Sequence, residues 1–355
     1  MAGDMPPVLG WVAVTGEVSA ESLLLFLIAP GRKDHLPVYH EPPRGTLRLM
    51  WYNVENLFYP GKDSLTPDHE FTPEGARHWT YSRYRLKLTA LAKVILAAGA
   101  WEAPDLVGLC EVECSEVLED LCGHPLLERF SYAYLHKDSP DHRGMDVACL
   151  YRSANIEILE WRTIPSRAKH MGTRDLMHLS LTFGKQDTLE LILLHFVSKF
   201  RGAGATAESR RIQAEQLFHG VDSLNSIHPG RLLLLAGDFN DYPLAYPLQP
   251  LSNALGGKDL LKRLIPFPDP LVKGTYKYRN RWIHLDQFYY CDPSRRFDAS
   301  ASILVLPPLV VRDEQYGGVK PRRSYLGYRY EGGISDHLPL VGVFRRIPSR
   351  SLPER

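Results

Sequence analysis

The sequence lacks an excess of either charge and any long apolar run. Its 42 Lys and Arg nearly balance 41 Asp and Glu, for a net charge of +1. No global basic field of the kind that marks a nucleic-acid coat protein is therefore present, and contact with a polyanion would rely on local patches. The longest apolar run near the N-terminus, residues 23–29, is far shorter than the roughly 20 residues that span a bilayer. No Lys or Arg precedes that run, so a signal peptide is not expected and a cytoplasmic protein is.

Cysteine is scarce, and no Cys-x-x-Cys pair occurs. The five residues, an odd number, are Cys110, Cys114, Cys122, Cys149 and Cys291. Several lie inside apolar runs, as reduced core cysteines do. Neither a disulfide framework nor a structural zinc site is expected.

What the chain does have is apolar sequence sufficient for a large core, at 44% hydrophobic residues in 355. Patterns of period 3.6 predict helices over 81–98, 115–122 and 206–224. Short apolar or alternating runs predict strands over 46–53, 106–110, 145–151, 176–183, 189–196, 231–237, 282–290, 303–306 and 338–344. Several strands follow one another directly, so we expect an α/β domain of two packed mixed sheets with helices outside.

The most informative stretch is residues 231–241, Arg-Leu-Leu-Leu-Leu-Ala-Gly-Asp-Phe-Asn-Asp. The leucine run predicts a strand buried on both faces. Gly237 is expected to turn the backbone there, so that Asp238 and Asn240 emerge at the carboxyl end of the strand, where open sheets present their chemistry. A plain polar turn is the alternative, because Asp and Asn are ordinary turn residues.

Several other predicted strands also end in polar residues. The full set is Asn53, Glu111, His195, Asp238 with Asn240, Asp286, and Asp336 with His337. Asp286 is a carboxylate within an aromatic strand, and a buried charge needs a partner. His337 is the candidate partner. Each residue alone is more often a turn, a cap or a structural histidine, but the set contains every group that one reaction needs.

That reaction is hydrolysis at phosphorus. A hard cation such as Mg²⁺ prefers carboxylate oxygens, which Glu111 supplies with Asp336 and Asn53 nearby. A histidine held by a carboxylate activates water, and Asp286 with His337 has the right types. Asn240 and His195 have the right types to bind phosphate oxygens as charge develops.

These residues resemble the endonuclease/exonuclease/phosphatase superfamily, which includes pancreatic deoxyribonuclease and the abasic-site endonucleases. The matching stretches, in the family's order, are 53–58 (Asn-Val-Glu-Asn-Leu-Phe), 109–111 (Leu-Cys-Glu), 143–148 (Arg-Gly-Met-Asp-Val-Ala), His195 with 198–202 (Ser-Lys-Phe-Arg-Gly), 237–240 (Gly-Asp-Phe-Asn), 285–286 (Leu-Asp) and 333–339 (Gly-Ile-Ser-Asp-His-Leu-Pro). The resemblance implies a four-layered α/β sandwich over residues 46–346, with an N-terminal extension over 1–45 and a tail over 347–355.

The resemblance also implies roles for the matching residues. Glu111 resembles the main metal ligand for Mg²⁺ or Mn²⁺, with Asn53 and Asp336 assisting. His337, oriented by Asp286, resembles the base or the transition-state partner.

Three further roles follow from the same resemblance. Asp238 would orient the water or serve the leaving group, and Asn240 would hold a phosphate oxygen. His195 resembles a second histidine of the deoxyribonuclease-like branch. Cys110 departs from the family's usual Gln, which questions one hydrogen bond on the metal side.

The substrate is open on sequence alone. A monomeric nuclease acting on nucleic acid is favoured by basic residues expected to rim the site, which are Arg143, Lys199, Arg201, Arg322 and Arg323. Aromatic residues 200, 325, 328 and 330 lie among them and suit base stacking. The alternatives are an enzyme acting on inositol phosphates or sphingolipid head groups, and a non-catalytic binding module on the same scaffold.

Overall fold

The computed structural model describes residues 45–61, 69–100, 102–141, 144–167, 174–184, 187–199, 202–243, 245, 248 and 261–348. All of them belong to one compact unit, residues 37–355. The predicted extension over 1–45 and the end of the predicted tail lie almost wholly outside the described residues. No helix in the described part of the chain combines the length and the apolar character needed to cross a membrane.

The first large sheet has the strand order β13-β18-β1-β2-β4-β3. At its centre, β1 (Thr46–Leu57) pairs with β18 (Leu340–Arg346) in antiparallel fashion and with β2 (Leu106–Val112) in parallel fashion. The outer strands are β13 (Phe297–Ile303), β4 (Asp146–Arg152) and β3 (Tyr132–His136).

The second large sheet has the order β5-β6-β7-β8-β12-β9. Its strands are β5 (Ile156–Ile164), β6 (Leu176–Phe183), β7 (Asp187–His195), β8 (Leu232–Asp238), β12 (Asp286–Cys291) and β9 (Lys262–Leu264). Only β7 and β8 run parallel in this sheet, and helix α4 (Ala207–Ile227) makes the crossover between them.

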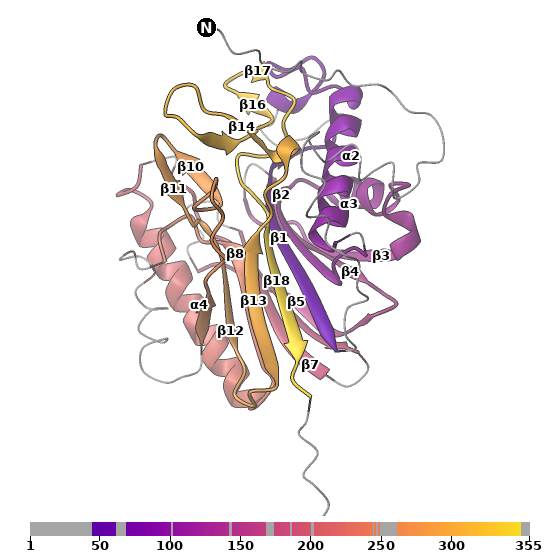
Figure 1. Ribbon diagram of the computed structural model, residues 1–355, viewed down its shortest axis with the longest axis vertical. Helices are drawn as coiled ribbons and strands as arrows, with labels where there is room; N and C mark the ends of the chain where they lie inside the picture. The colour runs from indigo at the N-terminus through magenta and orange to yellow at the C-terminus, as the bar shows by residue number, and fades with distance from the viewer. Residues whose placement is uncertain are drawn as a thin grey trace, which may run out of the picture. The chain divides into compact units, whose positions relative to one another are not determined.

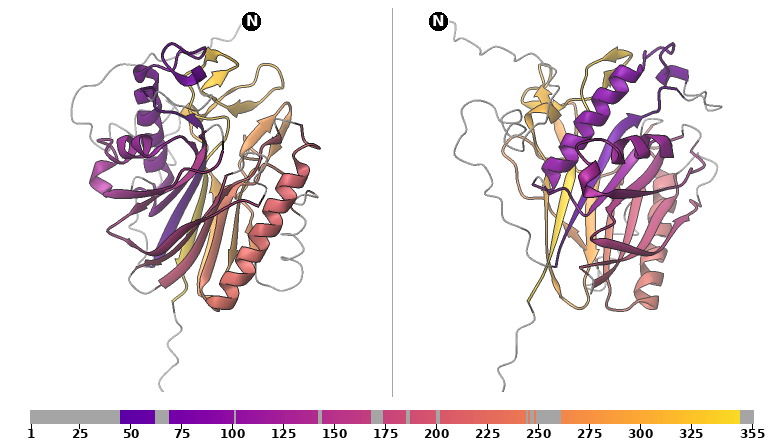
Figure 2. Two further views of the ribbon diagram at one scale, coloured as in Figure 1. Left: turned by 180° about the vertical axis from the view of Figure 1, so that it is seen from behind. Right: turned by 90° about the vertical axis from the view of Figure 1, so that its right-hand side faces the viewer.

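The two sheets pack face to face, with helices on their outer faces (Figures 1 and 2). Side chains of both sheets, such as Leu49, Trp51, Leu191 and Leu234, fill the layer between them. Helices α2 (Tyr81–Ala98) and α3 (Ser115–Cys122) cover the first sheet, and α4 covers the second. The predicted four-layered α/β sandwich is confirmed.

Short elements lie at the end of the sandwich where β1, β2 and β8 finish. They are η1 (His69–Phe71), η6 (Pro307–Leu309), β10 (Tyr276–Tyr278), β11 (Arg281–Ile283), β14 (Val310–Arg312), β15 (Val319–Pro321), β16 (Tyr325–Leu326) and β17 (Arg329–Tyr330). A further short helix, η2 (Glu128–Phe130), lies immediately before β3. All five cysteines are free, as expected.

Helices 81–98 and 115–122 and strand 176–183 have the predicted bounds. The predicted strand 282–290 is wrong, because the chain forms two ladders separated by His284 and Leu285. Ile283 pairs with Tyr276 in a hairpin, whereas pairing with β8 begins only at Asp286. The predicted strand 303–306 is also wrong, since β13 ends at Ile303 and the amide of Leu304 donates to the carbonyl of Pro339.

Gly237 does not turn the backbone as predicted. It lies within β8, paired with Leu194 on one side and Gln287 on the other. A Cβ at this position would lie 2.4 Å from Leu194 Cγ and 2.5 Å from its carbonyl oxygen. The residue is therefore needed for the close approach of β7 and β8 directly before Asp238.

Gly237→Ala should lower the free energy of unfolding by about 1–3 kcal/mol, because the added methyl group has no space in a packed sheet. The measurement is urea unfolding followed by circular dichroism. Gly220→Ala in α4 is the matched control, since nothing lies within 4 Å of its added Cβ and alanine favours a helix by roughly 0.5–1 kcal/mol. Equal stability changes of the same sign in both variants would contradict the packing argument.

Candidate active site

The predicted polar strand ends meet at one end of the sandwich. The pairing of β7, β8 and β12 places three of them on one rung, because Asp238 pairs with His195 on one side and with Asp286 on the other. Asn53 and Glu111 come from the neighbouring strands β1 and β2, and His337 lies just before β18.

Both oxygens of the buried Asp286 carboxylate have a partner. Its Oδ1 accepts a hydrogen bond of 2.9 Å from Trp51 Nε1, and its Oδ2 lies 2.7 Å from His337 Nδ1. This bond fixes the imidazole so that Nε2 faces Asp238, at 3.9 Å from its Oδ2. The predicted Asp286–His337 partnership is present in the structure.

His337 carries a raised pKa. Burial disfavours the imidazolium, but the carboxylates of Asp286 and Asp238 outweigh this effect and move the pKa of His337 well above its ordinary value of 6.5. A raised pKa favours the imidazolium form, in which Nε2 is a hydrogen-bond donor.

Asp238 is held from three sides. Its Oδ1 accepts 2.8 Å from the backbone amide of Asn240, and its Oδ2 accepts 3.2 Å from Asn53 Nδ2. His195 Nε2 lies 3.6 Å from the same Oδ2. Burial, opposed by His337, raises the pKa of Asp238 to about 7. A carboxyl group with a pKa near neutrality is suited to proton transfer.

Asn240 adopts a left-handed backbone conformation, with φ of 50°. Its side-chain Nδ2 donates 3.0 Å to the carbonyl oxygen of Phe196, which fastens the end of β8 to the end of β7. An amide nitrogen carries two protons, so one donor of Asn240 remains for a substrate oxygen.

Glu111 also has a left-handed backbone, with φ of 65°, at the bulge where β2 ends. Its two oxygens accept 3.1 Å from Asn53 Nδ2 and 2.9 Å from the amide of Asn56. Asn53 thus bridges the carboxylates of Glu111 and Asp238, while its own Oδ1 accepts from the amide of Glu55.

A buried ionic cluster that was not predicted lies behind Asn53. Glu55 Oε2 accepts 2.6 Å from the amide of Ser324, and Lys87 Nζ donates to the carbonyl oxygen of Glu55 and to Ser324 Oγ. Burial raises the pKa of Glu55 to about 8 and lowers that of Lys87 to about 8. The signal in the sequence was a lysine on the apolar stripe of the 81–98 helix.

Asp336 joins this cluster through Arg323. Its Oδ2 is ion-paired with Arg323 Nη2, and Arg323 Nε lies 3.9 Å from Glu55 Oε1. Asp336 therefore lies beside the site with one oxygen already engaged. Arg323, predicted as part of the substrate-binding rim, is held by these two carboxylates beside the site.

The donor set fits a hard divalent cation. The carboxylates of Glu111 and Asp238 accept from Asn53, Asp286 is paired in register with Asp238, and Glu55 and Asp336 are joined through Arg323. All their donors are oxygens, which Mg²⁺ prefers. Glu111 is only partly buried and could hold an ion through its two oxygens. The ligand atoms of Asp238, Asp286 and His337 also lie within 4.8 Å of one another and form a group that could hold one.

Cys110, the departure from the family pattern, pairs in register with Asn53 beside this donor set. It packs fully buried in the core between the two sheets. Burial moves the pKa of its thiol well above the ordinary value of 9.0, so the thiol stays neutral.

Only part of the predicted basic rim lies within the described residues. Lys199 Nζ lies 2.5 Å from Asp241 Oδ1, and Arg322 Nη2 donates 3.3 Å to the carbonyl oxygen of Glu331. Arg143 and Arg201 lie outside the described residues. Tyr325 is buried, whereas Tyr328 is 62% exposed.

The fold has counterparts among solved structures. D. rerio TDP2 complexed with a single-strand DNA product is 15% identical, with a TM-score of 0.54 over 84% of this chain and 99% of that one. The human Nocturnin catalytic domain with bound sulfate is 16% identical, with a TM-score of 0.52 over 86% and 96%. An endonuclease/exonuclease/phosphatase from Bacteroides vulgatus is 14% identical, with a TM-score of 0.55 over 85% and 99%. At these identities the likeness shows the fold.

Curated relatives match only short segments. A stretch of 27 residues is 82% identical to protoheme IX farnesyltransferase of Nitrosospira multiformis, which is 8% of this chain and 9% of that protein. A stretch of 73 residues is 41% identical to the same enzyme of Acidovorax sp., or 20% of this chain and 21% of that protein. The chain thus spans a small part of these relatives, and neither match covers the candidate site as a whole.

The family assignment comes from a longer match. The model of the endonuclease/exonuclease/phosphatase family matches residues 48–346, a span that runs from β1 to the end of β18 and includes every residue of the site described above. The chain therefore belongs to the endonuclease/exonuclease/phosphatase family.

Proposed function

We propose that this protein is a Mg²⁺-dependent phosphodiester hydrolase, a nuclease of the endonuclease type, in which water attacks phosphorus in line with the leaving oxygen. One observation carries the proposal. The Asp286–His337 pair, joined at 2.7 Å, faces Asp238 across the site, and Asn53 Nδ2 donates both to Asp238 Oδ2 and to Glu111 Oε1. This arrangement supports a proton acceptor, a cationic donor and a cation-binding carboxylate acting around one position.

Glu111 would hold the ion, with Asp336 assisting. Bound Mg²⁺ would neutralise charge that develops on a phosphate oxygen. Asn53 positions the Glu111 carboxylate through its Nδ2, so its own contribution is to hold the ligand in place.

His337 acts as a donor to a non-bridging phosphate oxygen, because its pKa is raised and its Nε2 points into the site. Asp286 fixes the ring and stabilises its charge. Asp238 takes the proton of the attacking water, because its pKa of about 7 lies near the working pH. Asn240 and His195 donate to the remaining oxygens.

Nucleic acid is the proposed substrate. Arg77 lies over the rings of Phe71, Tyr325 and Tyr328, at 4.8, 5.4 and 5.3 Å from their centroids. Tyr328 is exposed in the loop between β16 and β17, so it can stack on a base. The D. rerio TDP2 structure carries a single-strand DNA product, which supports the same substrate class for this fold.

Glu111→Gln should reduce turnover of an oligonucleotide by about 100-fold or more, because a neutral amide is a poor ligand for a hard cation. The measurement is the rate across a Mg²⁺ titration, with circular dichroism to show that the variant is folded. Glu128→Gln, an exposed position, is the control. Full activity of the parent protein in excess chelator would overturn the metal requirement.

Asp286→Asn and His337→Ala should each slow the reaction by about 10²–10⁴-fold, the range for a positioned acid–base group. The double variant should lose little more than the worse single variant, because the two residues act as a unit. Single-turnover rates at saturating substrate provide the comparison. Multiplicative losses would show that the two residues act independently.

Arg322→Ala should weaken oligonucleotide binding and reduce its dependence on salt, since each phosphate contact contributes a log–log slope of about −0.7 to −0.9. Turnover of a small chromogenic phosphodiester should stay the same, because that substrate contacts only the centre. Arg345→Ala is the control, since Arg345 lies at the far end of β18 from the site. Good turnover of an inositol phosphate with no oligonucleotide cleavage would replace the nuclease proposal with a phosphatase.

A further inference from the structure

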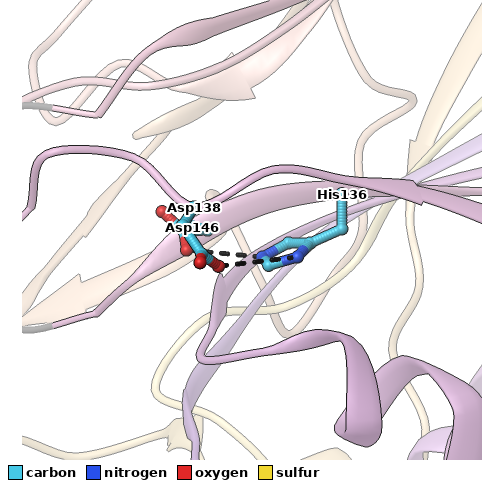
Figure 3. Close-up of side chains that lie close together, drawn as sticks. All are labelled: His136, Asp138 and Asp146. Carbon is cyan, nitrogen blue, oxygen red and sulfur yellow. Dashed lines mark ion pairs between the residues drawn. The ribbon is translucent and has the colours of Figure 1, made fainter.

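A second group of potential metal ligands lies where β3 ends and β4 begins. His136 is the last residue of β3, Asp146 is the first residue of β4, and Asp138 lies in the loop between them. One ligand atom from each residue lies within 4.8 Å of the others. Figure 3 shows the imidazole of His136 directed at the two carboxylates.

The imidazole of His136 is buried without a hydrogen bond at Nε2. Its side chain is 5% exposed, and Nε2 has no hydrogen-bond partner within the described part of the chain. Nε2 nevertheless lies 3.3 Å from Asp146 Oδ2, in an orientation that makes no hydrogen bond. The other oxygen of Asp146 accepts 2.8 Å from the amide of Ser139, which fixes the carboxylate.

This separation is the one expected between two ligands of one cation. When each ligand lies about 2.0–2.2 Å from the ion, neighbours in a tetrahedral or octahedral shell are about 3–3.5 Å apart. Here a buried nitrogen and a buried carboxylate oxygen lie at this distance without a hydrogen bond between them. An ion bound between the two atoms would satisfy both.

The group is separate from the candidate active site. Side chains two residues apart on a strand lie on the same face. Tyr132 and Tyr134 of β3, and Ala148 and Leu150 of β4, face the core beneath α2 and α3, so His136 and Asp146 lie on this outer face. Val147 and Cys149 point the other way, toward the second sheet.

We propose that His136, Asp138 and Asp146 form a second cation site, which binds a first-row transition metal such as Zn²⁺. The imidazole nitrogen selects such a metal over Mg²⁺ and Ca²⁺, which prefer oxygen ligands alone. Asp138 Oδ1 lies 4.0 Å from the other ring nitrogen, Nδ1, and the side chain is 89% exposed, so Asp138 would reach the ion from the open side together with water. The ion would tie the loop after β3 to the start of β4. The site contains no cysteine, which is why the cysteine pattern did not indicate zinc.

The test is zinc binding in the presence of excess Mg²⁺, which occupies oxygen-only sites. Zinc binding would be measured by isothermal titration with ZnCl₂ and by the zinc content after desalting. The proteins compared are the parent, His136→Gln, Asp138→Asn and the control Asp298→Asn, which changes an exposed residue of β13. The parent and the control should bind one equivalent of zinc. Asp138→Asn should bind about 10-fold more weakly, and His136→Gln should lose the equivalent.

A further variant separates this site from the active site. Glu111→Gln should retain the zinc equivalent, whatever the outcome of the activity assays. No zinc bound by the parent, or a zinc equivalent lost in Glu111→Gln but kept in His136→Gln, would overturn the proposal. Asp138 is exposed, so Asp138→Asn reports on the site even if His136→Gln does not fold.

Discussion

The buried carboxylate of Asp286 is the interaction on which both the sandwich and its candidate site depend. The residue belongs to the second sheet, yet its partners Trp51 and His337 belong to the first sheet and to the loop that leads into it. A carboxylate in this position is tolerated only while both partners are in place. The packing of the two sheets and the orientation of the His337 imidazole are therefore set by the same two hydrogen bonds. A change that lets the sheets slide would also misplace the ring.

Lys87 and Glu55, next to the candidate site, are also ionisable residues in buried positions. Lys87 and Glu55 are both almost inaccessible to water, and burial moves their pKa values toward each other, to about 8 in each case. Ser324 contacts both residues, so the loop that carries Arg323 is anchored to β1 and to α2. A buried polar group is costly unless it is hydrogen-bonded, and Lys87 meets this need through the backbone carbonyl of Glu55 and through Ser324 Oγ. These hydrogen bonds specify where this loop lies.

Much of this arrangement could be predicted from the sequence, because it depends on local patterns. Apolar runs that end in Asp238, Glu111 and His195 placed these residues at strand ends, and the parallel β7–α4–β8 unit brings such ends together. Longer-range features could not be predicted. The strand is interrupted at His284 because the residues before it pair with β10 and the residues after it pair with β8. Asn53 bridges two carboxylates that are distant from it in sequence, which no local pattern indicates. The contacts of Lys199 and Arg323 with Asp241 and Asp336 also required the folded chain.

The shared rung of His195, Asp238 and Asp286 limits how this chain can diverge. Side chains alternate between the two faces of a strand, so inserting or deleting one residue in β7, β8 or β12 would turn one member of the rung away from the others. Length changes are therefore confined to the connections between strands. The short elements β14 to β17 are part of such a connection, since they form two small sheets of their own and belong to neither large sheet. In such a fold, loops can change in length and in what they bind while the three polar residues of the rung keep their spacing.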